Sequence, residues 1–459
     1  MTAIADSAAP GLAAFDRLRA EHEPWLHECF VPPPDFDFMA GGRSAAVIGD
    51  TGSGKTAIAR ALMARARARN LVVDWRPEPA PGAPLPWEES RSQFEDILSL
   101  VAHSLLERLA TEPGRYLAAA GWAQDTFGWF IRRYLPKGGL AERSLPAERL
   151  DDRGREIARR LLDAEGATIA TRDLPATEAA RQLLEALQKI GLDGIWAVAD
   201  GLGAQLATAA PDLERSLRAF LSTLPLLQMT GCTYKIMTPL ELQNLVIESE
   251  AVDRSYLDVY RLDWTMSEAD EMREDDTERF GLLREIAERR LALATGAEHF
   301  PLEALCGAPG FQQWLQRLGS GSPLGWLTTI RPLVAEYLRP PAEMRCPLSA
   351  EQWKKIGQRQ TIRVRLAADD SVIVGWRVIR GLGETELRVL ACLLEHRNQF
   401  VTRDELHRYV FPKDSTREAP ERGVVDTALW RLRKALEPFP GQQQIIVSVR
   451  NGGVCLRAA

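Results

Sequence analysis

The stretch Gly49-Asp50-Thr51-Gly52-Ser53-Gly54-Lys55-Thr56 decides the fold class of this 459-residue chain. It follows the apolar run Ala45–Ile48, and the next residues, Ala57–Met63, have a composition typical of a helix. A G-x-x-x-x-G-K-[ST] pattern between a strand and a helix is that of a phosphate-binding loop. Its glycines permit a backbone curl that aims N–H groups at phosphate oxygens. A glycine-rich turn with an incidental lysine would not need a strand before it and a helix after it. The sequence therefore predicts a nucleoside triphosphate site.

Lys55 and Thr56 carry the chemistry of this loop. The Lys55 ammonium supplies a positive charge for the β- and γ-phosphates, and the Thr56 hydroxyl is suited to ligate Mg²⁺. We therefore expect ATP and Mg²⁺ as cofactors. The nucleotide would be bound by the whole loop: Gly49, Asp50, Thr51, Gly52, Ser53, Gly54, Lys55 and Thr56.

Later apolar runs predict further strands of a parallel sheet. Leu71–Trp75 is one, Ile195–Ala199 ends in Asp200, and Tyr234–Met237 ends at Thr238. The carboxyl ends of parallel strands lie along the sheet edge where an α/β fold binds its ligand. Asp200 is therefore a candidate catalytic residue and Mg²⁺ ligand. Thr238 is a candidate to sense the γ-phosphate or a catalytic water.

The residues after Asp200 bear on hydrolysis. Many phosphate-loop ATPases have a second acid there to polarise the attacking water, whereas Gly201–Gln205 contains none. Gln205 offers an amide that could orient water instead, or the base comes from another segment. We expect a weak ATPase, which suits a switch better than a processive DNA motor.

The spacing of these motifs predicts additional helical parts. More than a hundred residues separate the second strand from Asp200, and Phe94–Leu109 repeats apolar residues at helical spacing. The aromatic residues Trp122, Phe127, Trp129, Phe130 and Tyr134 favour the core of a helical insertion over a ligand cage. We expect a nucleotide domain over residues 1–255 with a helical insertion near 90–175, and a helical lid or linker over 256–345.

The net charge of −6 argues against a dedicated nucleic-acid binder, but the charge is unevenly distributed. Residues 346–459 hold 19 basic and 13 acidic side chains, a net charge of +6, so residues 1–345 carry −12. The average therefore hides a basic C-terminal module on an acidic body.

Other features of the sequence exclude several protein classes. No apolar run approaches the ~18 residues that span a membrane, and the N-terminus lacks the pattern of a secretory signal. The six cysteines show no CxxC spacing. We expect a cytoplasmic protein without a zinc or disulfide framework.

The C-terminal module, residues 346–459, has the element order of a winged helix. Alternating runs within 362–379 predict short strands, and Thr402 with Glu405 forms a capping box. A terminal hairpin is expected around Arg450-Asn451-Gly452-Gly453. The expected helices are one marked by Leu387–Leu394, a second at Arg403–Val410 and a third at Val424–Glu437. The fold class is therefore α/β, with a C-terminal α+β module.

Residues 20–340 resemble the STAND/AAA-like signalling ATPases. The resemblance rests on the phosphate loop, Asp200 followed by Gly-Leu, Leu262-Asp263-Trp264 and Gly321-Ser322-Pro323. In that group a Gly-x-Pro motif in the helical lid couples nucleotide state to domain packing, and the resemblance implies this role for Gly321-Ser322-Pro323. Leu324 departs from the arginine that often follows the proline in related ATPases.

The lid also contains arginines whose role stays open at this point. They could contact nucleotide in this subunit or a neighbouring one, although arginines on helices are more often solvated or paired at the surface. These residues are Arg289, Arg290 and Arg331.

Residues 362–457 resemble the OmpR/PhoB-like output domain of response regulators. Val425–Leu436 matches that family's recognition helix, which enters the major groove of DNA, and Ser448–Val454 matches its wing. Asn451 and Val454 depart from the family's glycine and aromatic residue. The resemblance implies DNA contacts at Thr427, Arg431, Arg433, Lys434 and Arg450.

Together these features predict an ATP-binding, slowly hydrolysing switch that controls a C-terminal DNA-binding domain, with a role in transcription regulation. The expected partners are double-stranded DNA and further copies of the chain, in an assembly that ATP favours. The alternative is an ATP-dependent assembly or defence ATPase whose winged helix binds a protein partner.

Overall fold

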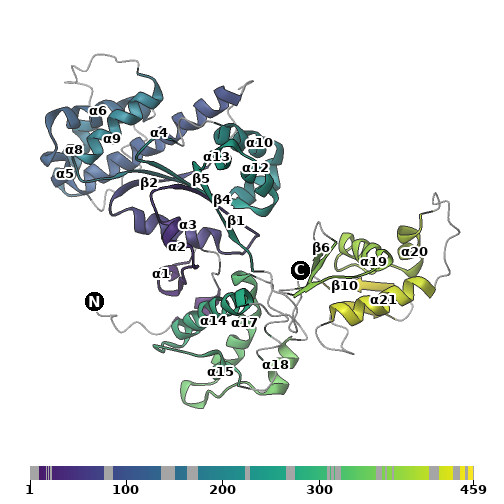
Figure 1. Ribbon diagram of the computed structural model, residues 1–459. Coiled ribbons are helices and arrows are strands. Elements are labelled where there is room, and N and C mark those ends of the chain that lie inside the picture. The colour runs from purple at the N-terminus through teal and green to yellow at the C-terminus, as the bar shows by residue number, and fades with distance from the viewer. Residues whose placement is uncertain are drawn as a thin grey trace. The chain divides into compact units, whose positions relative to one another are not determined.

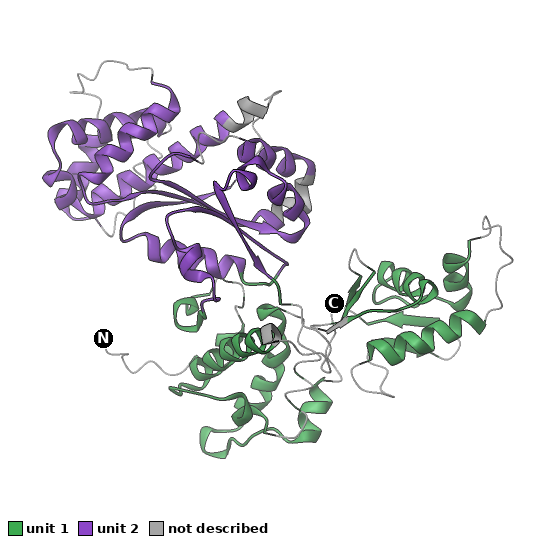
Figure 2. Ribbon diagram, viewed as in Figure 1, with its two compact units in different colours: residues 1–31, 52–54, 263–459 green, residues 32–51, 55–262 purple. Residues whose placement is uncertain are grey.

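The structure is a computed structural model, and its residues form two compact units (Figure 2). Unit 1 contains residues 1–31, 52–54 and 263–459, and unit 2 contains residues 32–51 and 55–262. The described residues are 10–16, 18, 20, 23–76, 86–135, 150–162, 174–222, 228–264, 274–307, 311, 315, 322–357, 364–366, 370–374, 377–412, 423–437, 445–449 and 453–457, without the side chains of 86–90, 204–210, 274–276 and 377–378.

A five-stranded parallel sheet forms the centre of unit 2 (Figure 1). Its order is β2-β3-β4-β1-β5, so β4 lies between the strand that leads into the phosphate loop and the strand that ends at Asp200. This confirms the predicted α/β fold and four of its strands. The strands are β1 Ser44–Gly49, β2 Asn70–Trp75, β3 Gly194–Ala199, β4 Cys232–Pro239 and β5 Leu257–Leu262.

The fifth strand, β5, has no counterpart among the expected elements. It pairs with β1 at the edge of the sheet, and its inner residues Asp258–Arg261 are only partly buried or exposed. Polar residues are tolerated there because an edge strand has a neighbour on one side only. The continuous apolar run typical of a central parallel strand is therefore missing.

Helices cover both faces of the sheet (Figure 1). On one face α3 packs against β1 to β4, and on the other α4, α9 and α10 contact β2, β3 and β4. The helical elements of unit 2 are α2 Phe36–Met39, α3 Lys55–Ala66, α4 Pro86–Thr111, α5 Pro113–Ala118, α6 Gly121–Tyr134, α8 Asp152–Leu162, α9 Ala176–Gln188, α10 Leu202–Ser222, η4 Leu240–Leu242, α12 Gln243–Ile247 and α13 Glu250–Asp253.

The expected aromatic core of the helical insertion is present in α6. Phe127 and Phe130 are fully buried, and the Tyr134 ring lies tilted against Phe130 with ring centroids 4.7 Å apart. Trp122 is the exception, since 47% of its surface is exposed at the first turn of the helix.

Unit 1 begins with short N-terminal helices that pack on the lid. Its helical elements are η1 Gly11–Phe15, α1 Leu26–Cys29, α14 Glu274–Thr295, α15 Leu302–Leu305, α17 Pro323–Leu338, η6 Ala342–Met344 and α18 Ala350–Gly357. The core around α14 and α17 includes Trp326, Ile330 and Leu333. None of the described helices is long and apolar enough to cross a membrane.

The lid arginines hold the N-terminal segment. Arg290 is buried in an ion pair with Glu23, and Arg331 pairs with Asp16 at 2.6 Å. Arg289 donates to the Phe30 carbonyl oxygen at 2.7 Å. These contacts favour the alternative that the arginines are structural pairs.

The C-terminal part of unit 1 has the expected winged-helix elements. Thr402 and Glu405 form the predicted capping box, with both reciprocal hydrogen bonds present. Val401 bridges to Val454, and a Cβ on Gly453 would lie 2.5 Å from the Val401 carbonyl oxygen, so only glycine fits there. The elements are β6 Val364–Leu366, β7 Val372–Val374, β8 Arg377–Ile379, α19 Glu384–Glu395, α20 Arg403–Val410, α21 Gly423–Leu436, β9 Ile446–Val449 and β10 Gly453–Leu456.

Candidate functional site

The phosphate loop follows β1 directly, and Lys55 is the first residue of α3. Gly52 and Gly54 have φ values of 82° and 97°, a region that side chains disfavour and glycine adopts freely. Asp50 Oδ1 accepts a hydrogen bond from the Thr51 N–H at 2.7 Å. The backbone therefore has the curl that the glycine spacing predicts.

Lys55 is held by the loop itself. Its Nζ donates to the carbonyl oxygens of Gly49 at 2.7 Å and Asp50 at 2.8 Å. Burial lowers the pKa of Lys55, while the nearby charges of Asp50 and Asp200 act in the opposite direction. The ammonium is thus partly desolvated beside the loop, where an anionic phosphate is a better partner than two neutral carbonyls.

Thr56 and Asp200 come together although they are far apart in the sequence. The Thr56 hydroxyl donates to Asp200 Oδ1 at 3.2 Å, from the first turn of α3 to the residue after β3. A hydroxyl and a carboxylate are oxygen ligands of the kind Mg²⁺ takes, with nucleotide phosphates and waters completing its shell. Asp74, next to last in β2, adds a carboxyl group whose pKa is raised by burial and by Asp200.

Thr238 lies on the strand next to the loop. It is fully buried and pairs in register with Ile48, the residue before Gly49. Its hydroxyl donates only a long bond, 3.5 Å, to the Ile236 carbonyl oxygen. The sheet order thus places Thr238 between the loop strand and the Asp200 strand.

The loop also contains a buried polar atom that suits a phosphate ligand. Ser53 is 2% exposed, and its Oγ has no hydrogen-bond partner. A buried hydroxyl without a partner is costly unless a ligand satisfies it. With the Lys55 ammonium, the Thr56 hydroxyl and the N-terminus of α3, this group fits Mg²⁺-nucleotide chemistry.

The middle of the loop is bonded to the lid, a feature that the motif alone does not reveal. The Leu324 N–H donates to the Gly52 carbonyl oxygen at 3.3 Å, and Trp264 Nε1 donates to the Ser53 carbonyl oxygen at 3.0 Å. Ser322 caps α17 by accepting from the Gly325 N–H. Ser322 belongs to the predicted Gly-Ser-Pro motif, and Leu324 follows it directly. The first residue of the motif, Gly321, lies outside the described residues.

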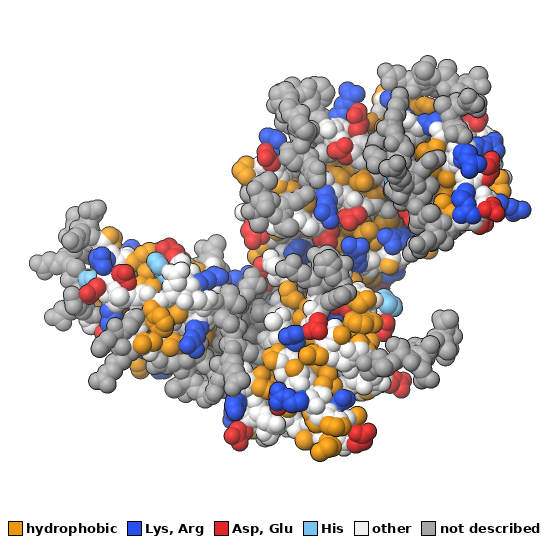
Figure 3. All heavy atoms as spheres, turned by 180° about the vertical axis from the view of Figure 1, so that it is seen from behind, with side chains coloured by type: hydrophobic (Ala, Val, Ile, Leu, Met, Phe, Trp, Pro, Cys, Tyr) orange, Lys and Arg blue, Asp and Glu red, His pale blue; other side chains and the backbone are white. Residues whose placement is uncertain are grey.

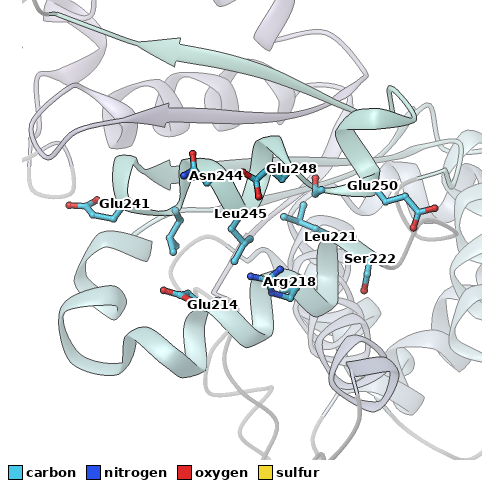
Figure 4. Close-up of a pocket in the computed structure, with 11 residues that line it drawn as sticks. Glu214, Arg218, Leu221, Ser222, Glu241, Asn244, Leu245, Glu248 and Glu250 are labelled. Carbon is cyan, nitrogen blue, oxygen red and sulfur yellow. The ribbon is translucent and has the colours of Figure 1, made fainter. Parts of the chain in front are cut away.

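A cavity of about 410 Å³ lies between α10 and the elements that follow β4 (Figure 4). Arg218 is the basic side chain in its lining, against the acidic Glu214, Glu241, Glu248 and Glu250. This mainly acidic lining is unsuited to a triphosphate. The side chain of Gln205, also on α10, lies outside the described residues.

Helix α21 presents the predicted DNA-contact residues in different ways. Arg433 is half-buried, and its guanidinium donates to the Ile446 carbonyl oxygen at 3.2 Å and to the Ser448 hydroxyl. Arg431 donates to the buried carboxylate of Glu386 on α19 at 3.0 Å. Both side chains therefore brace α21 within its own domain, and burial lowers the pKa of Arg433.

Thr427 and Lys434 are exposed on the same helix, and Arg450 lies outside the described residues. The Thr427 hydroxyl donates to the Gly423 carbonyl oxygen at 2.9 Å, and the Lys434 Nζ lies 5.6 Å from the centre of the Trp430 ring. Trp430 was not among the expected contacts. An aromatic residue on the polar side of an amphipathic helix is the signal that points to it.

Comparisons with known proteins agree with the C-terminal assignment. No curated protein matches the chain. Among solved structures, the chain is similar to the ORC2 protein of Aeropyrum pernix, described in ADPNP-ADP complexes, with 12% identity, coverage of 95% of this chain and 94% of that one, and a TM-score of 0.34. The family described as "Transcriptional regulatory protein, C terminal" matches residues 380–456. The chain therefore ends in a winged-helix domain of this transcriptional regulatory type.

Proposed function

We propose that the chain is an ATP-dependent switch that controls DNA binding by its winged helix, and that it regulates transcription. ATP occupies the phosphate loop, with Mg²⁺ between Thr56, Asp200 and the phosphates. Lys55 neutralises phosphate charge, and Thr238 senses the γ-phosphate or a water. Hydrolysis is slow because no acid follows Asp200 directly.

The hydrogen bonds between loop and lid carry this proposal. A peptide group is planar, with its C=O and N–H pointing in opposite directions. The Gly52 carbonyl shares a peptide with the Ser53 N–H, and the Ser53 carbonyl shares one with the Gly54 N–H. By bonding these carbonyls, Leu324 and Trp264 orient the N–H groups that a phosphate would use.

Lid packing and phosphate binding are therefore thermodynamically coupled. If the lid arrangement changes the affinity for ATP by some factor, ATP must change the equilibrium between lid arrangements by the same factor. Leu324 and Trp264 belong to the unit that also contains the winged helix. This continuity supports a route from the nucleotide to DNA binding.

The switch is tested by DNA binding of the intact protein at fixed salt, with ATP and Mg²⁺, with ADP, and without nucleotide. A pool of random-sequence duplexes serves as the probe. We expect ATP to change the affinity at least about tenfold relative to ADP, within the usual range of coupling between sites. Lys55→Ala should abolish the difference, whereas Arg65→Ala, exposed in the last turn of the same helix, should retain it.

Two results would contradict the proposal. An unchanged nucleotide effect in Lys55→Ala would disconnect the loop from DNA binding. Strong ATP-dependent assembly without measurable DNA affinity would instead favour the assembly ATPase with a protein-binding winged helix.

A further inference from the structure

Helix α21 carries an unusually exposed tryptophan. Trp430 is 61% exposed, whereas Trp326 and Trp353 of the same unit are almost completely buried. Indole is among the largest apolar side chains, and tryptophan is enriched where proteins contact a partner. Figure 3 shows hydrophobic and basic side chains exposed side by side on the winged-helix part of the chain.

Trp430 is the centre of a stripe along α21. Thr427, Trp430 and Lys434 are spaced by three and four residues, so they lie on one face of the helix. The Thr427 hydroxyl is bonded to the helix backbone, and the Lys434 ammonium lies over the indole. The stripe therefore offers an indole surface with a positive charge beside it.

The charges around the stripe favour a polyanionic partner. Asp426, which adjoins it, is neutralised by an ion pair of 2.7 Å with Arg403 of α20. Arg431 is likewise paired with Glu386 of α19, whereas Arg433 is bonded to neutral groups of β9 and therefore adds positive charge beside Lys434. The indole and Lys434 are therefore exposed on this face, beside Arg431, whose guanidinium is held by Glu386 although its side chain is 62% exposed.

The geometry points to Trp430 as a specificity-determining contact to DNA, in which the indole packs against the 5-methyl group of thymine in the major groove. Lys434 contacts an adjacent phosphate. The inference rests on the proposed DNA binding. Thymine displays its methyl group in the major groove, where apolar side chains distinguish it from other bases, whereas an indole cannot reproduce the paired hydrogen bonds by which arginine selects guanine.

The test removes the methyl group and the indole separately and together. Duplexes that bind the intact protein are selected from a random pool, and the preferred duplex is remade with deoxyuridine in place of thymidine at each position in turn. This change removes the methyl group and retains base pairing. We expect wild type to lose about fourfold in affinity at a contacted thymine, the effect of exposing one methylene-sized group.

Variants of Trp430, measured on the same two duplexes, complete a double-mutant cycle. Trp430→Ala should bind the thymidine and deoxyuridine duplexes equally, whereas Trp430→Tyr should retain part of the preference. The inference would be overturned, with DNA binding intact, if wild type bound the thymidine and deoxyuridine duplexes equally. An unchanged preference for thymidine in Trp430→Ala would overturn it as well. If wild type selects no duplex at all, the proposed function fails as well. A Trp430→Ala variant that changes only the oligomeric mass would assign the indole to a protein partner and contradict the DNA contact.

Discussion

The phosphate loop and helix α21 were both anticipated from short motifs, but they differ in what the motif determines. In the loop the glycine spacing determines the backbone, and Lys55 and Thr56 are positioned by the curl and by the start of α3. In α21 the resemblance supplies side-chain roles, yet Arg433 and Arg431 are bonded within the domain. A motif that works through the backbone is therefore more transferable than one that works through exposed side chains.

The largest expected effect concerns the backbone of the loop. Gly52→Ala forces a side chain into a left-handed conformation, which costs about 1–2 kcal/mol, and places its Cβ 3.0 Å from Leu324 Cβ. We expect it to destabilise unit 1 by about 2 kcal/mol or more in urea unfolding, and to weaken ATP binding in a titration.

Gly281→Ala is the matched control, because this glycine is exposed in α14 and its added Cβ would meet no atom within 4 Å. It should leave ATP affinity unchanged and stabilise the helix by up to about 1 kcal/mol. Equal behaviour of the two variants would mean that the loop does not need its left-handed glycine.

The next expected effect separates two neighbouring basic residues of α21. Arg433→Ala removes hydrogen bonds to Ile446 and Ser448, which should lower the free energy of unfolding by about 1–3 kcal/mol. Lys434→Ala should leave stability unchanged and reduce the log–log salt slope of DNA binding by about 0.9, the contribution of one phosphate contact.

Unfolding curves and salt titrations of both variants distinguish these roles. A loss of salt slope in Arg433→Ala of the same size as in Lys434→Ala would assign Arg433 to the DNA interface, as the family resemblance implies. An unchanged slope in Lys434→Ala would remove Lys434 from the interface.

Local pattern was sufficient to predict most of the fold. Four strands of the sheet, the capping box at Thr402 and the terminal hairpin follow from apolar runs, caps and turns in short windows. Strand β5 was not predicted, because its partly exposed inner residues mix polar and apolar types, whereas β2, the other edge strand, contains an apolar run. Local signals therefore predict a strand best where its sequence contains an unbroken apolar run.

The site was only partly predictable, because its remaining contacts join distant segments. Thr56 with Asp200 followed from the expected sheet edge, and their hydrogen bond agrees with it. The bonds from Leu324 and Trp264 to the loop, and from Arg433 to β9, depend on packing that no short window encodes. The sequence thus identified candidate residues, whereas the structure identified which of them are already hydrogen-bonded within the protein.

The smallest expected effect concerns a second lysine, Lys235, which like Lys55 is bonded to backbone carbonyl oxygens beside β1. Lys235 is fully buried, contacts the carbonyl oxygens of Gly41 and Arg43, and lies 4.8 Å from the centre of the Trp196 ring. Burial lowers its pKa to about 8, although Asp258 opposes the shift. Unlike Lys55, it belongs to β4 and lies beside the start of β1, in register with Ala45, so its role should be structural.

The pH dependence of stability tests this role. Below pH 8 the folded and unfolded states both keep the proton, and the folded state bears the full cost of the buried charge. Above pH 8 and up to the ordinary pKa of 10.5, the folded state loses a proton that the unfolded state retains. The free energy of unfolding should therefore rise by about 1 kcal/mol from pH 7 to pH 9. This rise should be absent in Lys235→Met and retained in Lys189→Met, which alters an exposed lysine.

Two results would contradict a structural role for a buried, titrating Lys235. Parallel curves of unfolding free energy against pH for wild type and Lys235→Met would show that the buried amine does not titrate in this range. A loss of ATP affinity in Lys235→Met would show that both ends of β1 contribute to nucleotide binding.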